Sequence, residues 1–228
     1  MINGLGDLFF PRYCMICERT LSSSTNILCK QCEINLPYTN FEKDLHNPLF
    51  QAFWGRSRVE FAASAFYFRS GENLQHLIHL LKYRHRPDIG LFLGKIIGQL
   101  ILKSENFNNI DYIIPVPLHN QRLRRRGYNQ SEEIAYGISE ILNIEVLPNI
   151  LFRSRYNVTQ THKKHYERWE NVDGIFDLRD YDFLVNKNIL LVDDVFTTGS
   201  TLEACVAPLN KVLGLKVFVF VVGYTSSK

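Results

Sequence analysis

Two adjacent carboxylates, Asp193 and Asp194, follow an apolar run in the segment 188–201, NILLVDDVFTTGST. Hydroxyl residues around Gly199 come next, and hydroxyls beside free N–H groups at a helix start suit a phosphate. The two carboxylates would repel a phosphate, but they suit sugar hydroxyls or Mg²⁺ held through water. The pattern therefore indicates a ligand with a polyol end and a phosphate end, as in ribose 5-phosphate chemistry. The alternative, a core strand that simply ends in turn residues, leaves the two charges unexplained.

Four of the five cysteines form two Cys-x2-Cys pairs, Cys14 with Cys17 and Cys29 with Cys32. Two such pairs can supply the four sulfurs of a tetrahedral zinc site, and four protein ligands make the metal structural. Two disulfides, four unrelated thiols or a redox Cys-x2-Cys are the alternatives, and a reducing compartment and polar, turn-rich surroundings disfavour them. The fifth, Cys205, is expected to be a small buried hydrophobic residue of a helix.

A run of arginines, Arg122, Arg124, Arg125 and Arg126, follows a strand that ends in the sequence Pro-Val-Pro. Guanidinium groups match the oxygens of phosphates, so these residues are candidates for binding an anion. The alternative, a solvated face of a helix, stays open for each arginine.

The elements that must position these residues alternate along the chain. We predict strands at 59–70, 110–118, 188–192 and 216–224, two short extended pieces around Pro148, and helices at 71–86, 87–104, 131–143 and 200–214, with Ser131 as an N-cap. Continuous apolar strands between helices indicate an α/β fold, a mostly parallel sheet flanked by helices, with ligands beyond the carboxyl ends of its strands. We place a domain boundary near residue 50, which separates a zinc-ribbon-like segment and linker (1–50) from the α/β domain (51–228).

The composition sets wide bounds. With 228 residues, 46% hydrophobic and 21% charged, the chain is typical of globular proteins, and a net charge of +3 permits phosphate-rich ligands without requiring them. The N-terminus lacks the pattern of a secretory signal, and the longest apolar stretches are too short to span a membrane or are interrupted by Lys95. We therefore expect a cytoplasmic protein with no membrane span.

The segment ILLVDDVFTTGST resembles the phosphoribosyl pyrophosphate (PRPP) signature of type I phosphoribosyltransferases. The chain as a whole resembles the ComF family, through the paired Cys-x2-Cys, LKYRHRPDIG, PVPLHNQRLRRRGYNQ, RSRYNVTQTHKKHYERWENVDGIF and the PRPP signature, in that order. The resemblance implies a type I phosphoribosyltransferase fold with a small N-terminal zinc ribbon. His162, Lys163 and Lys164 depart from the family pattern, which leaves the second-substrate site undefined.

The resemblance also implies roles for residues. Asp193 and Asp194 would take the ribose hydroxyls, and Mg²⁺ would bridge them to the pyrophosphate. The 5-phosphate would bind at Thr197, Thr198, Gly199, Ser200 and Thr201. Pyrophosphate would bind at Pro115, Val116, Pro117 and Leu118, with Arg122 and Arg126 assisting. A closing loop, 153–169, would exclude water, and no catalytic residue is assigned.

Two functions follow as hypotheses. The first is a PRPP-binding, Mg²⁺-dependent phosphoribosyltransferase with a role in competence and the uptake of transforming DNA. The second is a non-catalytic adaptor or PRPP sensor, whose zinc ribbon and basic segment bind a helicase or single-stranded DNA.

Overall fold

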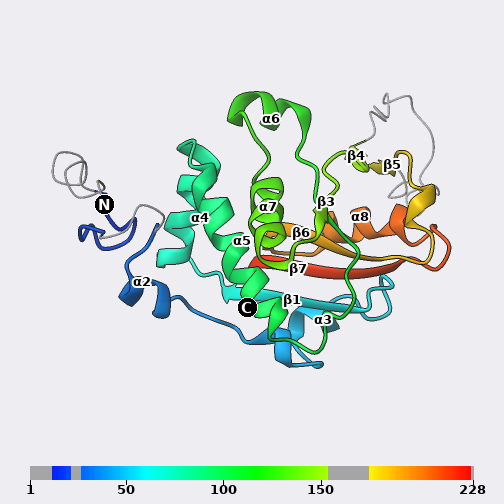
Figure 1. The fold of residues 1–228 in the computed structure, drawn as a ribbon, viewed down its shortest axis with the longest axis horizontal. Helices are drawn as coiled ribbons and strands as arrows, with labels where there is room; N and C mark the ends of the chain where they lie inside the picture. Colours follow the sequence, from blue (N-terminus) through cyan, green and yellow to red (C-terminus); the bar gives the residue numbers. More distant parts are fainter. Residues whose placement is uncertain (1–11, 22–26, 154–174, 227–228) are drawn as a thin grey trace, which may run out of the picture.

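The centre of the molecule is a five-stranded, wholly parallel sheet (Figure 1). The computed structural model describes residues 12–21, 27–153 and 175–226. The strands follow the order β1-β7-β6-β2-β3: β1 (Phe61–Tyr67), β7 (Lys216–Tyr224), β6 (Asn188–Phe196), β2 (Tyr112–Pro115) and β3 (Glu145–Val146). This arrangement confirms the predicted α/β class.

The central strands are apolar because both of their faces are covered. Ile189, Leu190, Leu191 and Val192 are fully buried, and all of β7 after its first residue is buried. The predicted strand 188–192 was too short, since β6 continues to Phe196. Its register with β7 runs on through Asp193 beside Val221 and Phe196 beside Tyr224. The two carboxylates therefore lie within the paired part of β6, and two further residues of the strand follow them.

The main helices are α4 (Asn73–Tyr83), α5 (Pro87–Leu102), α6 (Asn120–Arg126), α7 (Gln130–Leu142) and α8 (Ser200–Leu209). Shorter ones are α2 (Lys30–Ile34), α3 (Pro48–Gln51), η1 (Phe41–Lys43) and η2 (Asp182–Leu184). The apolar face predicted for α4 is buried, and Pro87 opens α5 as expected. Cys205 is fully buried in α8, as predicted.

Helices α5 and α7 touch through glycines. A Cβ atom on Gly94 would lie 2.1 Å from the carbonyl oxygen of Ile134, and one on Gly137 would lie 2.2 Å from that of Leu91. No side chain fits between the two backbones at these positions. Because α7 also packs on β2 and β6, this contact fixes the start of α7 beside the ends of those strands.

The two extended pieces predicted around Pro148 are β3 and β4 (Leu151–Arg153). β4 pairs with β5 (Phe176–Leu178) in an antiparallel ribbon outside the main sheet. The predicted closing loop lies outside the described residues, except for Arg153. No helix in the described ranges is both long and apolar enough to cross a membrane.

Candidate functional site

Asp193 and Asp194 have different partners, because successive side chains of a strand point to opposite faces. The Oδ1 atom of Asp193 accepts hydrogen bonds from the hydroxyl of Ser131, at 2.9 Å, and from the backbone N–H of Asp194, at 2.8 Å. The Oδ2 atom of Asp194 lies 2.8 Å from the ammonium of Lys82, in the last turn of α4. The acidic pair is thus connected to α7 on one side and to α4 on the other.

The prediction that Ser131 caps α7 was wrong. Asn129 is the N-cap, and its side-chain oxygen accepts from the N–H of Ser131 at 3.2 Å. The amide of Asn129 also donates to the carbonyl of Val116, at 3.0 Å. Asn129 therefore ties α7 to the segment after β2, and Ser131, within the first turn, is free to turn its hydroxyl to Asp193.

The pKa of Asp193 is raised to about 7. Burial is the main cause, and the neighbouring carboxylate of Asp194 adds to it. The hydrogen bonds from Ser131 and from the N–H of Asp194, and the charge of Lys82, act in the opposite direction without cancelling it. A cation or a hydroxyl donor placed beside Asp193 would favour its ionised form.

The predicted pyrophosphate segment, 115–118, lies next to the acidic pair. Pro115 pairs with Val192 in the sheet, and the N–H of Val116 donates to the carbonyl of Val192 at 2.9 Å. Prolines have no N–H, so among these four residues only Leu118 keeps a backbone donor for an anion. Cationic side chains would have to supply most of the attraction for a pyrophosphate here.

The start of α8 carries the predicted phosphate-binding loop. Gly199 is the N-cap, with a φ of 82°, and a Cβ there would lie 2.9 Å from the ring of Phe196. Glycine is therefore required by both conformation and space. The hydroxyls of Thr198 and Ser200 lie 3.0 Å apart, and these side chains are exposed together with those of Thr197 and Thr201. Hydroxyls and helix N–H groups are thus open to a ligand at one place.

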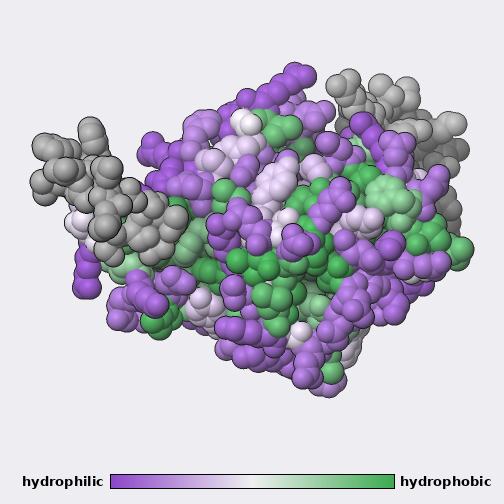
Figure 2. Space-filling model, viewed as in Figure 1, coloured by the Kyte–Doolittle hydropathy of each residue, from purple (hydrophilic) through white to green (hydrophobic). Residues whose placement is uncertain are grey.

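A basic hollow of about 500 Å³ lies between the end of α4 and helix α6. It is lined by Lys82, Tyr83, His85, Arg122, Arg125 and Arg126. The guanidinium of Arg126 stacks over the ring of Tyr83, 5.5 Å from its centroid. Figure 2 shows that the surface around α6, at the top of the view, is mostly hydrophilic. Two of the predicted anion-binding residues, Arg122 and Arg126, therefore meet in one concave site.

Sequence reasoning missed Lys82, Asn129 and Ser131 as partners of the site. Lys82 belongs to the segment LKYRHRPDIG, which was matched to the family without a role. The signal that could have found it is its place in the last turn of an amphipathic helix, next to the buried Leu81. Nothing in the spacing of the sequence brings that turn to Asp194.

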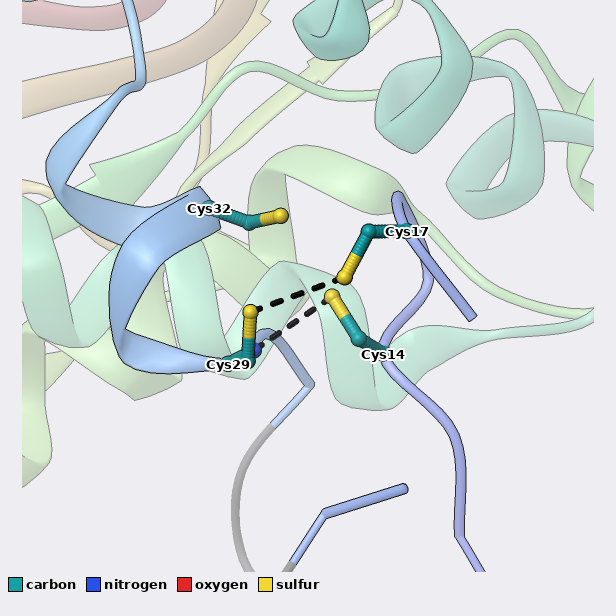
Figure 3. Close-up of side chains that lie close together, drawn as sticks. All are labelled: Cys14, Cys17, Cys29 and Cys32. Atoms are coloured by element: carbon teal, nitrogen blue, oxygen red, sulfur yellow. Dashed lines mark hydrogen bonds between the residues drawn. The ribbon is translucent and has the colours of Figure 1, made fainter. Parts of the chain in front are cut away.

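The four N-terminal cysteines converge (Figure 3). All four are free thiols whose sulfurs lie within 4.8 Å of one another, and those of Cys17 and Cys29 are 3.6 Å apart. Cys14 and Cys17 flank a turn, whereas Cys29 and Cys32 lie at and just inside the start of α2. The cluster has the number and kind of donors that a metal ion such as zinc takes.

The thiols of this cluster differ in acidity. Burial disfavours a thiolate at Cys14, but backbone groups of Cys17, Cys29 and Ile16 bond to its sulfur and lower its pKa to about 6. Burial and the neighbouring cysteines raise the pKa of Cys32 to about 12. Four thiolates this close repel one another, and a divalent cation removes that repulsion.

Known proteins similar to this chain are named for competence and for DNA utilization. Competence protein F of Haemophilus influenzae is 29% identical over 91% of this chain and 94% of its own length. DNA utilization protein YhgH of Escherichia coli strain K12 is 29% identical over 82% of this chain and 79% of its own. Competence protein ComFC of Bacillus subtilis is 33% identical over 40% of this chain and 35% of its own. The chain is thus similar, over most of its length, to a competence protein, in keeping with its resemblance to the ComF family. No protein-family model matches the chain.

Solved structures similar to the chain include an amidotransferase and a phosphoribosyltransferase. Glutamine PRPP amidotransferase from B. subtilis has a TM-score of 0.44 and 19% identity, over 64% of this chain and 30% of the amidotransferase chain. Adenine phosphoribosyltransferase from Leishmania tarentolae has a TM-score of 0.39 and 12% identity, over 79% of this chain and 88% of its own.

Proposed function

We propose that this protein, which resembles the ComF family, binds PRPP together with Mg²⁺ at the carboxyl edge of its sheet. The observation that carries the proposal is the position of Asp193 and Asp194. They lie beside the segment 115–118 and on the strand that leads into the hydroxyl-rich start of α8. One extended ligand with a phosphate, a ribose and a diphosphate suits these three neighbouring environments.

Each part of PRPP has donors or acceptors to match. The ribose hydroxyls would donate to the carboxylates of Asp193 and Asp194. The 5-phosphate would accept from hydroxyls and N–H groups of 197–201, and the diphosphate would accept from the N–H of Leu118 and from Arg122 and Arg126. Asp193 and Asp194 would hold Mg²⁺, directly or through water, and the metal would neutralise charge on the diphosphate.

For the N-terminal cysteines, we propose a structural zinc ion held by Cys14, Cys17, Cys29 and Cys32. All four donor positions are filled by the protein, which leaves no open position for a substrate. The zinc-ribbon segment 1–50 and the phosphoribosyltransferase-like domain 51–228 remain the proposed division of the chain.

The biological role that we propose is in competence and DNA uptake, after the names of the relatives. Phosphoribosyl transfer to an acceptor is the proposed activity. A second candidate is a PRPP-sensing adaptor, and the exposed Arg122, Arg124 and Arg125 on α6 favour it, because such cations bind nucleic-acid phosphates.

Titration of the purified protein with PRPP and Mg²⁺ tests the proposal. We expect saturable binding that is lost, by at least about tenfold in affinity, in an Asp193→Asn, Asp194→Asn double variant, because ribose and metal lose their anionic acceptors. Asp182→Asn, an exposed aspartate of η2, is the control and should bind as the wild type does. Pyrophosphate release with a panel of bases and amines separates the two candidates: turnover supports a transferase, and binding without turnover supports the sensor. Absence of PRPP binding would contradict both.

A further inference from the structure

Lys82 belongs to two neighbouring features at once. Its ammonium lies 2.8 Å from the Oδ2 atom of Asp194, and its side chain also lines the basic hollow beside Arg122, Arg125 and Arg126. Of the described residues that line this hollow, four carry permanent positive charge and none is a carboxylate. Lys82 thus stands between the acidic pair and a site with excess positive charge.

The ion pair is shielded from solvent. The side chain of Lys82 is 25% exposed and that of Asp194 is 14% exposed, so the pair is screened less than one on the surface. The ammonium therefore neutralises Asp194 and occupies one of its oxygens when no ligand is bound. An incoming metal ion has to compete with Lys82 for this carboxylate, because Mg²⁺ also binds carboxylate oxygens.

The hollow offers Lys82 a second partner once an anion enters. The cations that line the hollow repel one another, and a diphosphate relieves that repulsion. Backbone donors are scarce in the segment 115–118, so binding of a diphosphate there depends on side-chain cations. Lysine suits an exchange of partners, since its ammonium is a compact charge on a flexible stem.

We propose that Lys82 is an exchangeable counter-ion of this site. In the unliganded protein it neutralises Asp194, and on binding of a metal-diphosphate ligand it leaves Asp194 to the metal and pairs with the diphosphate. This inference rests on the proposed binding of PRPP, and it adds a residue that the ComF resemblance did not assign. Lys82 is on this account a positioning residue for the metal and a direct ligand of the diphosphate.

Lys82→Met tests the exchange because it removes the charge and keeps an unbranched stem. The variant should bind Mn²⁺, a probe of the magnesium site, about threefold more tightly in the absence of PRPP, since Asp194 loses its competitor. It should bind PRPP, at saturating Mn²⁺, about tenfold more weakly, since the diphosphate loses a charged donor. Calorimetric titration measures PRPP, and electron paramagnetic resonance of free Mn²⁺ measures the metal.

Because these two affinities should change in opposite directions, the result distinguishes an exchange of partners by Lys82 from a general disruption of the site. Lys95→Met is the matched control, because Lys95 forms an ion pair with Glu140 at 2.7 Å, on the outer faces of α5 and α7, and should leave both affinities unchanged. Loss of both affinities in Lys82→Met, or no change in either, would overturn the inference while wild-type PRPP binding stands. If the wild type binds no PRPP, the proposed function fails, and this inference fails with it.

Discussion

Asp193 is the residue whose environment departs furthest from what its chemistry prefers. This carboxyl lies within a core strand, beside a second carboxyl, and its pKa is raised to about 7 because burial and Asp194 both disfavour its charge. Ser131 holds its Oδ1 atom in place by a hydrogen bond at 2.9 Å. A carboxyl in such surroundings lowers the free energy of unfolding at neutral pH. A ligand that supplies a cation or hydroxyls beside it would restore that free energy.

This loss of stability predicts a pH-dependent effect of Asp193→Asn. The native state keeps the Asp193 proton up to about pH 7, whereas the unfolded chain releases it near its ordinary pKa of 3.8. The stability that the proton confers is therefore complete below the unfolded pKa and is lost as the pH rises through about 7. We expect the variant to increase the free energy of unfolding at both pH values, and by about 2 kcal/mol more at pH 8 than at pH 5.

Urea unfolding at the two pH values measures this difference. Asparagine still offers Oδ1 to Ser131 and to the N–H of Asp194, so the packing is kept. Asp182→Asn controls for the loss of one negative charge at an exposed position. An equal change of stability at pH 5 and pH 8 would show that the titration of Asp193 is not its source.

At the scale of elements, the contact of α5 with α7 positions the site. Gly94 and Gly137 let the two backbones meet, and α7 in turn carries Asn129 and Ser131 to the ends of β2 and β6. The glycines thus affect the acidic pair from the middle of two helices.

Gly94→Ala tests this dependence. The new Cβ would lie 2.1 Å from a backbone oxygen that cannot move away alone, so α7 must shift. We expect a loss of about 3 kcal/mol in the free energy of unfolding, together with weaker PRPP binding because Ser131 moves from Asp193. Chemical unfolding and calorimetry measure the two effects, with Gln99→Ala on the exposed side of α5 as the control. A stable variant with unchanged affinity would contradict this role of the helix contact.

Prediction from the sequence succeeded where local periodicity determines the element. The buried face of α4, Pro87 at the start of α5, and the strands β2 and β7 follow from apolar spacing and proline. It failed at Ser131, because Asn129 caps α7 and also donates a hydrogen bond to the carbonyl of Val116. It also failed at the end of β6, because pairing with β7 lengthens that strand. Lys82 was missed because its ion pair joins elements that only the folded sheet brings together.

At the scale of the whole molecule, the cysteine segment is continuous with the rest of the core. Cys14, Leu28 and Leu36 belong to the same buried apolar cluster as the sheet. Arg86, at the N-cap of α5, donates to the sulfur of Met15 at 3.1 Å. Metal binding at the cysteines should therefore stabilise a segment that also covers part of the larger domain.

Removal of the metal should test this link. We expect the purified protein to contain stoichiometric zinc. Cys29→Ser or a chelator should remove the zinc and lower the melting temperature by several degrees. Cys205→Ser, at a buried cysteine of α8 outside the cluster, should keep the zinc. Metal analysis and thermal unfolding measure these outcomes. A protein without zinc, with the same melting temperature after Cys29→Ser, would contradict a structural metal site.

PRPP binding at the sheet edge is tested most directly by the structure of crystals soaked with PRPP and Mg²⁺. We predict the ribose hydroxyls beside Asp193 and Asp194, the 5-phosphate at 197–201, and the diphosphate between Leu118 and the hollow lined by Arg122 and Arg126. PRPP bound elsewhere on the protein, or an unoccupied edge of the sheet at saturating PRPP and Mg²⁺, would contradict it.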